Sequence, residues 1–346
     1  MSDRVLAWAV RGLWALLPFT VWPAIGAAVH HQPSAVRTTA VVGAWALWGV
    51  VLVAALVRVP VGLTTLRCAA PAVLAAAVAV VFTGDPSAAA MVVAVGWSAV
   101  LTAVVFLPST AIVWVNGPAY PNERRFPLVA PGPLLLGPIE VAWALLVGLP
   151  SAAALLLADR HWVLGGVLAV AAVPAVVVLG RALHGLSRRW LVFVPAGIVV
   201  HDRASLADPV LFQRPLIASL APAPGGRTAA GGDTARGAAS ALGPDPTGAA
   251  SAAGSDPTGA ASAANTDPTG AASAASMDLT HGAPGLALEL RLREAVPLAR
   301  AAVRGTSETQ AAWGVLVTPG RPGAALAYAA AHRVPVESGT QTGGGP

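Results

Sequence analysis

Lysine is absent from this sequence, and cysteine occurs once, at Cys68. A single cysteine excludes an intramolecular disulfide framework and a cysteine-based zinc site. Charged residues make up only 11% of the 346 residues, whereas soluble proteins usually contain roughly 25%. Apolar residues make up 55% of the chain. This composition favours an integral membrane protein over an ordinary soluble one.

The sequence also lacks the short motifs of common catalytic and nucleotide-binding sites. It contains no GxxxxGK[ST] loop, no HExxH pair, no GxSxG turn and no GxGxxG turn after a strand. The adjacent His30 and His31 have no acidic or cysteine partner at metal-ligand spacing, and His201-Asp202 has no nucleophile beside it. We therefore predict no catalytic residue, no cofactor and no metal site, and we favour an enzyme least among three classes of function.

Long apolar runs fill the first half of the chain. A helix needs about 20 mainly apolar residues to cross the hydrocarbon core of a bilayer. We predict a transmembrane domain at 1–185 with about six spans, which lie at 5–29, 38–57, 68–83, 88–107, 134–157 and 161–183. The first run could instead be a cleaved signal peptide, because Arg4 and Arg11 precede it and small residues end it; cleavage would leave five spans.

Arginines are distributed unevenly between the ends of these spans. With the N-terminus inside, the opposite segments hold two arginines, Arg37 and Arg160. The cytoplasmic segments hold Arg4, Arg11, Arg58, Arg67, Arg124, Arg125, Arg181, Arg188 and Arg189. Because cytoplasmic loops keep an excess of positive residues near helix ends, we predict a multi-pass protein of the plasma membrane with both termini in the cytoplasm. These arginines stand singly or in pairs, so we expect no basic face for nucleic acid.

Two places in the membrane half are candidate sites. Glu140 falls inside the predicted span 134–157, and an ionisable residue at membrane depth can be a proton or cation site. The alternative is a carboxylate at the cytoplasmic edge, because a run rich in proline and glycine precedes Glu140. Arg188 and Arg189 follow the last span, where they would face anionic lipid headgroups. Tryptophans near the span ends are interpreted as interfacial anchors.

After Arg189 the pattern changes to short strand-like runs. Residues 190–194 and 198–202 flank a turn and are typical of a hairpin. Leucines at every second position from Leu286 to Leu292 predict a strand with one buried face, and 313–317 predicts another. The alanine-rich run 323–333 is predicted to form a closing helix.

A long segment between these runs consists almost entirely of Ala, Gly, Ser, Pro and Thr. Within it, DPTGAASAA occurs three times with a period of eleven residues. This composition offers too little apolar surface to offset the entropy of ordering, so we predict a disordered insertion at 222–277. The insertion divides the C-terminal domain into 186–221 and 278–337, and 338–346 is predicted to be a disordered tail.

Three parts of the C-terminal half carry a resemblance to known proteins. They are RRWLVFVPAGIVVHD with ADPVLF, then MDLTHGAPGLALEL, and then VTPGRPGAALAYAAAHRVPV. In these parts the chain resembles uncharacterised actinobacterial integral membrane proteins, whose C-terminal part is similar to bacterial pleckstrin-homology-like domains. The resemblance implies a split β-barrel or sandwich with a C-terminal helix, and no activity or ligand comes with it.

Together, these observations predict an α-helical multi-pass membrane bundle with a small C-terminal β-rich domain. We expect a non-enzymatic protein whose helices lie in the lipid bilayer and anchor a cytoplasmic module. The module would bind a partner protein or assemble with copies of itself. The alternative is a small transporter or channel that uses Glu140 and the proline-containing helices. The sequence identifies no small-molecule ligand.

Overall fold

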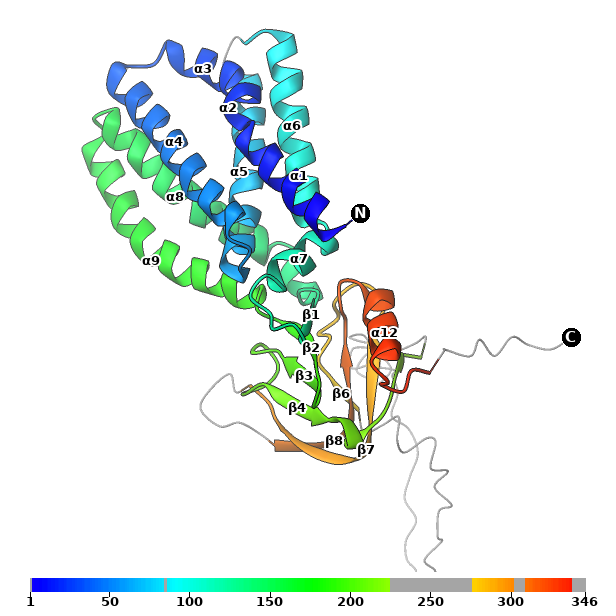
Figure 1. Cartoon of the computed structure of the whole chain (residues 1–346). Helices are drawn as coiled ribbons and strands as arrows, with labels where there is room; N and C mark the ends of the chain where they lie inside the picture. The colour runs from blue at the N-terminus through cyan, green and yellow to red at the C-terminus, as the bar shows by residue number, and fades with distance from the viewer. Residues whose placement is uncertain (1, 84–85, 225–275, 302–308, 338–346) are drawn as a thin grey trace, which may run out of the picture.

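The computed structural model describes residues 2–83, 86–224, 276–301 and 309–337, which form a helical bundle and a β-rich domain (Figure 1). The bundle consists of α1 (Asp3–Ala15), α2 (Leu17–Thr20), α3 (Trp22–His30), α4 (Ser34–Leu56), α5 (Pro60–Thr83), α6 (Ala88–Phe106), α7 (Pro108–Val115), α8 (Pro138–Ala158) and α9 (Trp162–Leu186). Most of the predicted insertion, 222–277, and the whole predicted tail, 338–346, lie outside the described residues.

Five of the described helices, α4, α5, α6, α8 and α9, are long and apolar enough to cross a membrane. Each overlaps one of the predicted spans. In the most apolar stretch of each helix, at most 28% of the residues are buried within the protein. Their apolar side chains therefore face outward, where a lipid bilayer would cover them.

The first predicted span, 5–29, is not one helix. It is divided into α1, α2 and α3, with breaks at Leu16 and Val21. Pro18 and Pro23 each lie in the first turn of the helix that follows the break, and neither can donate a backbone hydrogen bond to the preceding helix. Among the described residues, five helices are long and apolar enough to be candidate spans, and the sixth predicted span is not confirmed as a single helix.

Two further spans begin at other residues than the sequence predicts. Helix α5 begins at Pro60 rather than at 68, so Arg67 belongs to the helix and not to the loop before it. Helix α8 begins at Pro138 rather than at 134, and a short 3-10 turn occupies Gly132–Leu135. Glu140 consequently lies in the first turn of α8. Both charged groups are placed near the end of the bundle that meets the β-rich domain.

The β-rich domain contains two four-stranded sheets, with strand orders β1-β2-β3-β4 and β5-β7-β8-β6. The strands are β1 (Arg124–Pro127), β2 (Trp190–Val194), β3 (Gly197–His201), β4 (Val210–Gln213), β5 (Ile217–Pro222), β6 (Ser276–Asp278), β7 (Leu288–Ala299) and β8 (Thr309–Val317). Helix α12 (Pro322–Ala331) follows β8, and its Tyr328 ring contacts Phe126 and Phe193 of the first sheet.

The predicted hairpin of β2 and β3 is confirmed, since Trp190 lies opposite His201 and Val194 opposite Gly197. The alternating leucines also form a strand, and Leu288, Leu290 and Leu292 are buried as predicted, but Leu286 precedes β7 and is exposed. Sequence reasoning missed β1, which comes from the connection between α7 and α8 and pairs with β2. A four-residue strand so far from its partner in sequence gives no hairpin signal.

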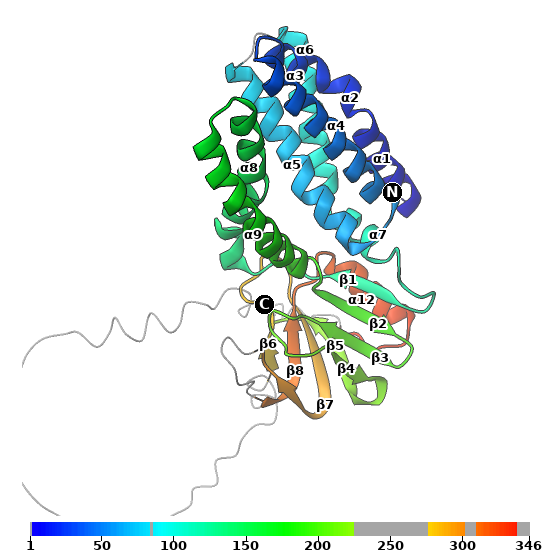
Figure 2. The ribbon, with the colours of Figure 1, turned by 90° about the vertical axis from the view of Figure 1, so that its left-hand side faces the viewer.

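Strand β2 is buried on both faces, which explains its unbroken apolar run. Its Leu191 and Phe193 pack into the core of the β-rich domain, together with residues of both sheets and α12. Its Trp190 and Val192 pack instead into the core of the helical bundle. Figure 2 shows the first sheet directly beneath the bundle. The two parts of the protein therefore share a packed boundary at β2.

Candidate functional site

Arg189, the residue before β2, forms an enclosed ion pair with Asp202, the residue after β3. The Arg189 Nε donates to Asp202 Oδ1 at 2.6 Å, and Nη2 donates to Oδ2 at 2.7 Å. The same guanidinium donates to the carbonyl oxygens of Val129 (3.1 Å) and Leu279 (3.3 Å). Arg189 is 2% exposed and Asp202 1%. This enclosure argues against the predicted lipid contact at Arg189 and indicates that the residue joins distant segments.

Asp202 also accepts hydrogen bonds from Ser205 Oγ (2.7 Å) and from the Ala204 N–H (3.1 Å). Burial alone would raise the pKa of Asp202, but the hydrogen bonds and charge of Arg189, with these two further donors, lower it below its usual value. Ser205 Oγ lies 2.7 Å from His281 Nε2 as well. The Ser205 hydroxyl thus lies between the Asp202 carboxylate and the His281 imidazole and links the residues after β3 to those after β6.

The side chains of His201 and Asp202 have different partners. The His201 Nδ1 lies 2.8 Å from the Arg188 carbonyl oxygen, and its ring stacks on Trp190 with centroids 5.1 Å apart. Burial lowers the pKa of His201, and the charges of Arg188 and Arg203 add to this effect. Together with Arg125, the half-buried Arg188 lines a cavity of about 550 Å³ beside β2. A lipid contact at Arg188 stays a prediction.

A second cavity, of about 580 Å³, lies where the bundle meets the β-rich domain, and we call it the junction cavity. Helices α5 to α9 contribute most of its wall, and the rest comes from β1, from the connection between β1 and α8, and from the residues between β8 and α12. Its apolar wall includes Pro71, Phe106, Ile112, Phe126, Leu128, Ile139, Trp143, Leu183 and Leu186. Its charged lining residues are Arg67, Glu140 and Arg321.

Glu140 is exposed, and its position in the first turn of α8 places its carboxylate near the positive end of the helix dipole. No ion pair to Glu140 is found within the described ranges. This geometry corresponds to the alternative reading of Glu140 as a carboxylate at the edge of the bundle, although the side chain does line the junction cavity.

Arg67 is the functional candidate that sequence reasoning overlooked. It was assigned to a loop, but it lies two turns into α5 with its guanidinium 5.5 Å from the centroid of the Phe106 ring. Its Nε is buried and has no hydrogen-bond partner. Pro60 at the start of α5 was the available signal, because proline favours the first turn of a helix and would have placed Arg67 inside the span.

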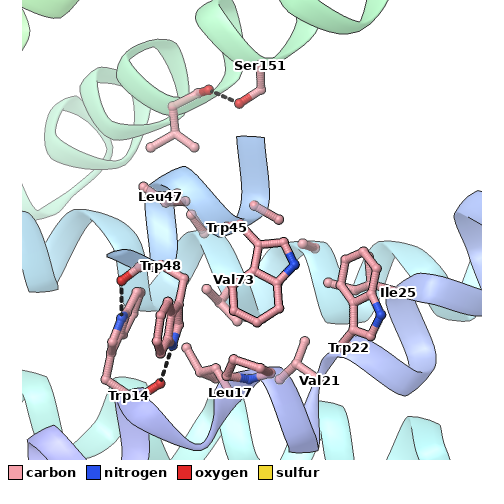
Figure 3. A pocket seen from close by; sticks show the side chains of 15 residues that line it. Trp14, Leu17, Val21, Trp22, Ile25, Trp45, Leu47, Trp48, Val73 and Ser151 are labelled. Carbon is pink, nitrogen blue, oxygen red and sulfur yellow. Dashed lines mark hydrogen bonds between the residues drawn. The ribbon is translucent and has the colours of Figure 1, made fainter. Parts of the chain in front are cut away.

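A smaller, mainly apolar pocket of about 250 Å³ lies between α1–α3, α4, α5 and α8 (Figure 3). Four of its lining residues are Trp14, Trp22, Trp45 and Trp48. The indole N–H of Trp14 donates to the Trp48 carbonyl at 3.0 Å, and that of Trp48 donates to the Trp14 carbonyl at 3.1 Å. The indole N–H groups of Trp14 and Trp48 thus join α1 to α4, and these two tryptophans are not interfacial anchors.

The described residues contain no group of three or more His, Cys, Asp or Glu side chains that could hold a metal ion. Comparison of the chain with protein-family models, with curated proteins and with solved structures finds no match to any of them.

Proposed function

We propose that this protein is a non-enzymatic membrane anchor for a cytoplasmic, pleckstrin-homology-like β module that binds a partner protein or a second copy of the chain. The observation that carries the proposal is strand β2, whose Trp190 and Val192 pack into the bundle while Leu191 and Phe193 pack into the β core. A module built into its membrane anchor in this way holds a fixed position at the bilayer.

The arrangement of the sheets supports a pleckstrin-homology-like module. Two sheets of mostly antiparallel strands enclose one core, and α12 contributes Ala325 and Ala329 to it. A C-terminal helix after the last strand is what the resemblance implies. Two features depart from a self-contained module: β1 comes from the membrane half, and β6 pairs with β8 in parallel.

The arginines support the cytoplasmic placement. Asp3 at the start of α1 lies 3.6 Å from Arg124 of β1, so the N-terminus of the bundle lies beside the β-rich domain. Arg37 near the start of α4 and Arg160 between α8 and α9 lie at the other end of these helices. The end with the excess of arginine is the end that carries the module, and such an excess is typical of the cytoplasmic side.

The outer edge of β4 is the place where a partner would bind. At the other edge of its sheet, the Asn116 side chain hydrogen-bonds both the N–H and the carbonyl of Arg125 in β1. In the second sheet, the Leu220 N–H of β5 donates to Pro335. Among the described residues, no strand pairs with the outer edge of β4, and its Leu211 is 42% exposed. An uncovered edge of this kind accepts an added strand from another chain.

Site-specific photo-crosslinking in cells tests this proposal. A photoreactive residue at Leu211 should give a discrete adduct, either with a second copy of the chain or with one reproducible partner. The same residue at Leu286, which is 45% exposed but lies outside the sheets, is the matched control and should give none. A purified chain that is monomeric in detergent, together with equal crosslinking at the two positions, would contradict the proposal.

A further inference from the structure

The junction cavity combines a long apolar wall with a buried arginine donor that has no hydrogen-bond partner. Its volume of about 580 Å³ falls within the range of about 300–1,000 Å³ that is usual for small-molecule sites. It lies between the ends of the candidate spans α5, α8 and α9. An acyl chain from the surrounding bilayer matches such a wall, because lipid tails and the apolar side chains are chemically alike.

Most polar groups in the cavity wall are already satisfied. Thr64 Oγ1 and Ser187 Oγ lie 2.7 Å apart and join α5 to α9. The Trp143 indole N–H donates to the Cys68 carbonyl at 2.9 Å. Glu140 is exposed.

Arg67 differs from these groups. Among the residues that the structure describes, it has no hydrogen bond or ion pair, and its Nε is buried. A buried, unpaired arginine donor in a membrane span is costly and marks a binding site by default. The guanidinium lies over the Phe106 ring, which contacts its flat face, so an oxyanion in the cavity would approach the Nη N–H donors in the guanidinium plane.

We propose that the junction cavity binds an anionic acyl lipid, whose phosphate or carboxylate accepts hydrogen bonds from Arg67 and whose chain lies against the apolar wall. The exposed Arg321, which lines the same cavity from the β-rich domain, supplies a second positive charge near the head group. A small inorganic anion would leave the apolar wall uncovered. A zwitterionic lipid would bring a positive charge toward a lining in which two arginines outnumber the one carboxylate, Glu140. The bound lipid would contact both the bundle and β1, because Phe126 lines the cavity.

Native mass spectrometry of the detergent-purified full chain tests this inference. Dioleoyl phosphatidylglycerol should remain bound at detergent concentrations that remove dioleoyl phosphatidylcholine. Arg67→Gln should weaken phosphatidylglycerol binding about ten-fold or more, because it removes a charge-assisted hydrogen bond to the head group. Arg181→Gln is the matched control: Arg181 is an exposed arginine of α9 that does not line the cavity, and its loss should leave binding unchanged. Arg67→Lys should recover part of the affinity.

A second measurement leaves the arginines of the cavity unchanged. Phosphatidylglycerol with brominated chains should quench the fluorescence of Trp143, which lines the cavity, and Trp143→Phe should remove the quenched part of the signal.

Competition of oleate with phosphatidylglycerol would support the proposal, because oleate carries a carboxylate head group on an acyl chain. Inorganic phosphate that binds alone with the same dependence on Arg67 would overturn it in favour of a small-anion site. Equal binding of the two phospholipids, unaffected by Arg67→Gln, would overturn it in favour of non-specific boundary lipid. The proposal does not depend on partner binding at β4, which the crosslinking experiment tests separately.

Discussion

At the scale of single residues, Arg189 and Asp202 join three segments at the boundary of the two parts. We predict that Asp202→Asn destabilises the protein by about 3 kcal/mol, because it leaves the buried Arg189 charge unpaired. Thermal unfolding of the full chain in detergent, followed by circular dichroism, measures the loss. Glu337→Gln, which removes an exposed partner of Arg291, should cost about 1 kcal/mol or less.

The same pair sets a dependence on pH. The pKa of Asp202 is lower in the folded chain than in the unfolded chain, so the carboxylate stabilises the fold above the unfolded pKa of about 4. This contribution is lost as the pH falls through the folded-state pKa. Unfolding temperatures measured from pH 7 down to pH 3 should therefore decrease less for Asp202→Asn than for the original chain. A parallel decrease in the two proteins would show that the pair does not contribute to acid sensitivity.

Gly197 is a second residue at which a small substitution should change stability, because there is no space for a Cβ atom. It begins β3 with a φ of 157°, and an added Cβ would overlap the Phe212 carbonyl oxygen of the neighbouring β4. We predict that Gly197→Ala destabilises the β-rich domain by about 2 kcal/mol or more. Gly323→Ala is the matched control, because Gly323 lies in α12 with open space around its Cα, and the change should be neutral or stabilising by about 1 kcal/mol. Equal melting temperatures of the two variants would contradict this account.

At the scale of elements, indole groups compensate for interruptions of the helices. Pro18 lacks the N–H that an unbroken helix would offer to the Trp14 carbonyl, and the Trp48 indole donates there instead. Trp97 donates in the same way to the Leu13 carbonyl at 2.9 Å. These contacts explain how the interrupted segment α1–α3 stays packed against α4 and α6.

We predict that Trp48→Phe destabilises the bundle by about 1–3 kcal/mol, since the Trp14 carbonyl is left without its donor in an apolar surrounding. Trp162→Phe is the control, because Trp162 is 66% exposed, and we expect a change of about 0.5 kcal/mol or less. Helix content during thermal unfolding in detergent measures both. A Trp48→Phe variant as stable as Trp162→Phe would show that the indole bond does not hold α1 to α4.

The elements also show where sequence patterns are sufficient. Five of the six predicted spans overlap long apolar helices, and the turn 195–197 predicted the β2–β3 hairpin, because both signals are local. The first predicted span is not confirmed as one helix, since hydropathy averages over Pro18 and Pro23 and does not register the breaks beside them. Arg67 was missed for a related reason: a charge at the edge of an apolar run was assigned to the loop, although Pro60 had already begun the helix.

At the scale of the whole molecule, the arginines predict the orientation in the membrane, and this prediction is open to a direct test. In a Cys68→Ala background, Gln32→Cys, in the loop between α3 and α4, should react with a membrane-impermeant maleimide in intact cells. Ala207→Cys, on an exposed part of the β-rich domain, should react only after the cells are opened. Labelling of Ala207→Cys in intact cells would place the module outside and remove the basis of the proposed function.

The sequence by itself determined that this protein has apolar helices for a bilayer, a separate region of short strands and an excess of arginine at one end of the helices. These properties depend on composition and local periodicity, which tertiary packing does not alter. The tertiary structure alone decided that β1 completes a sheet of the distant β2, that Arg189 is enclosed by Asp202, and that Arg67 lines a cavity between the two parts. Each of these features joins residues far apart in the chain, and local sequence patterns do not predict contacts between distant residues.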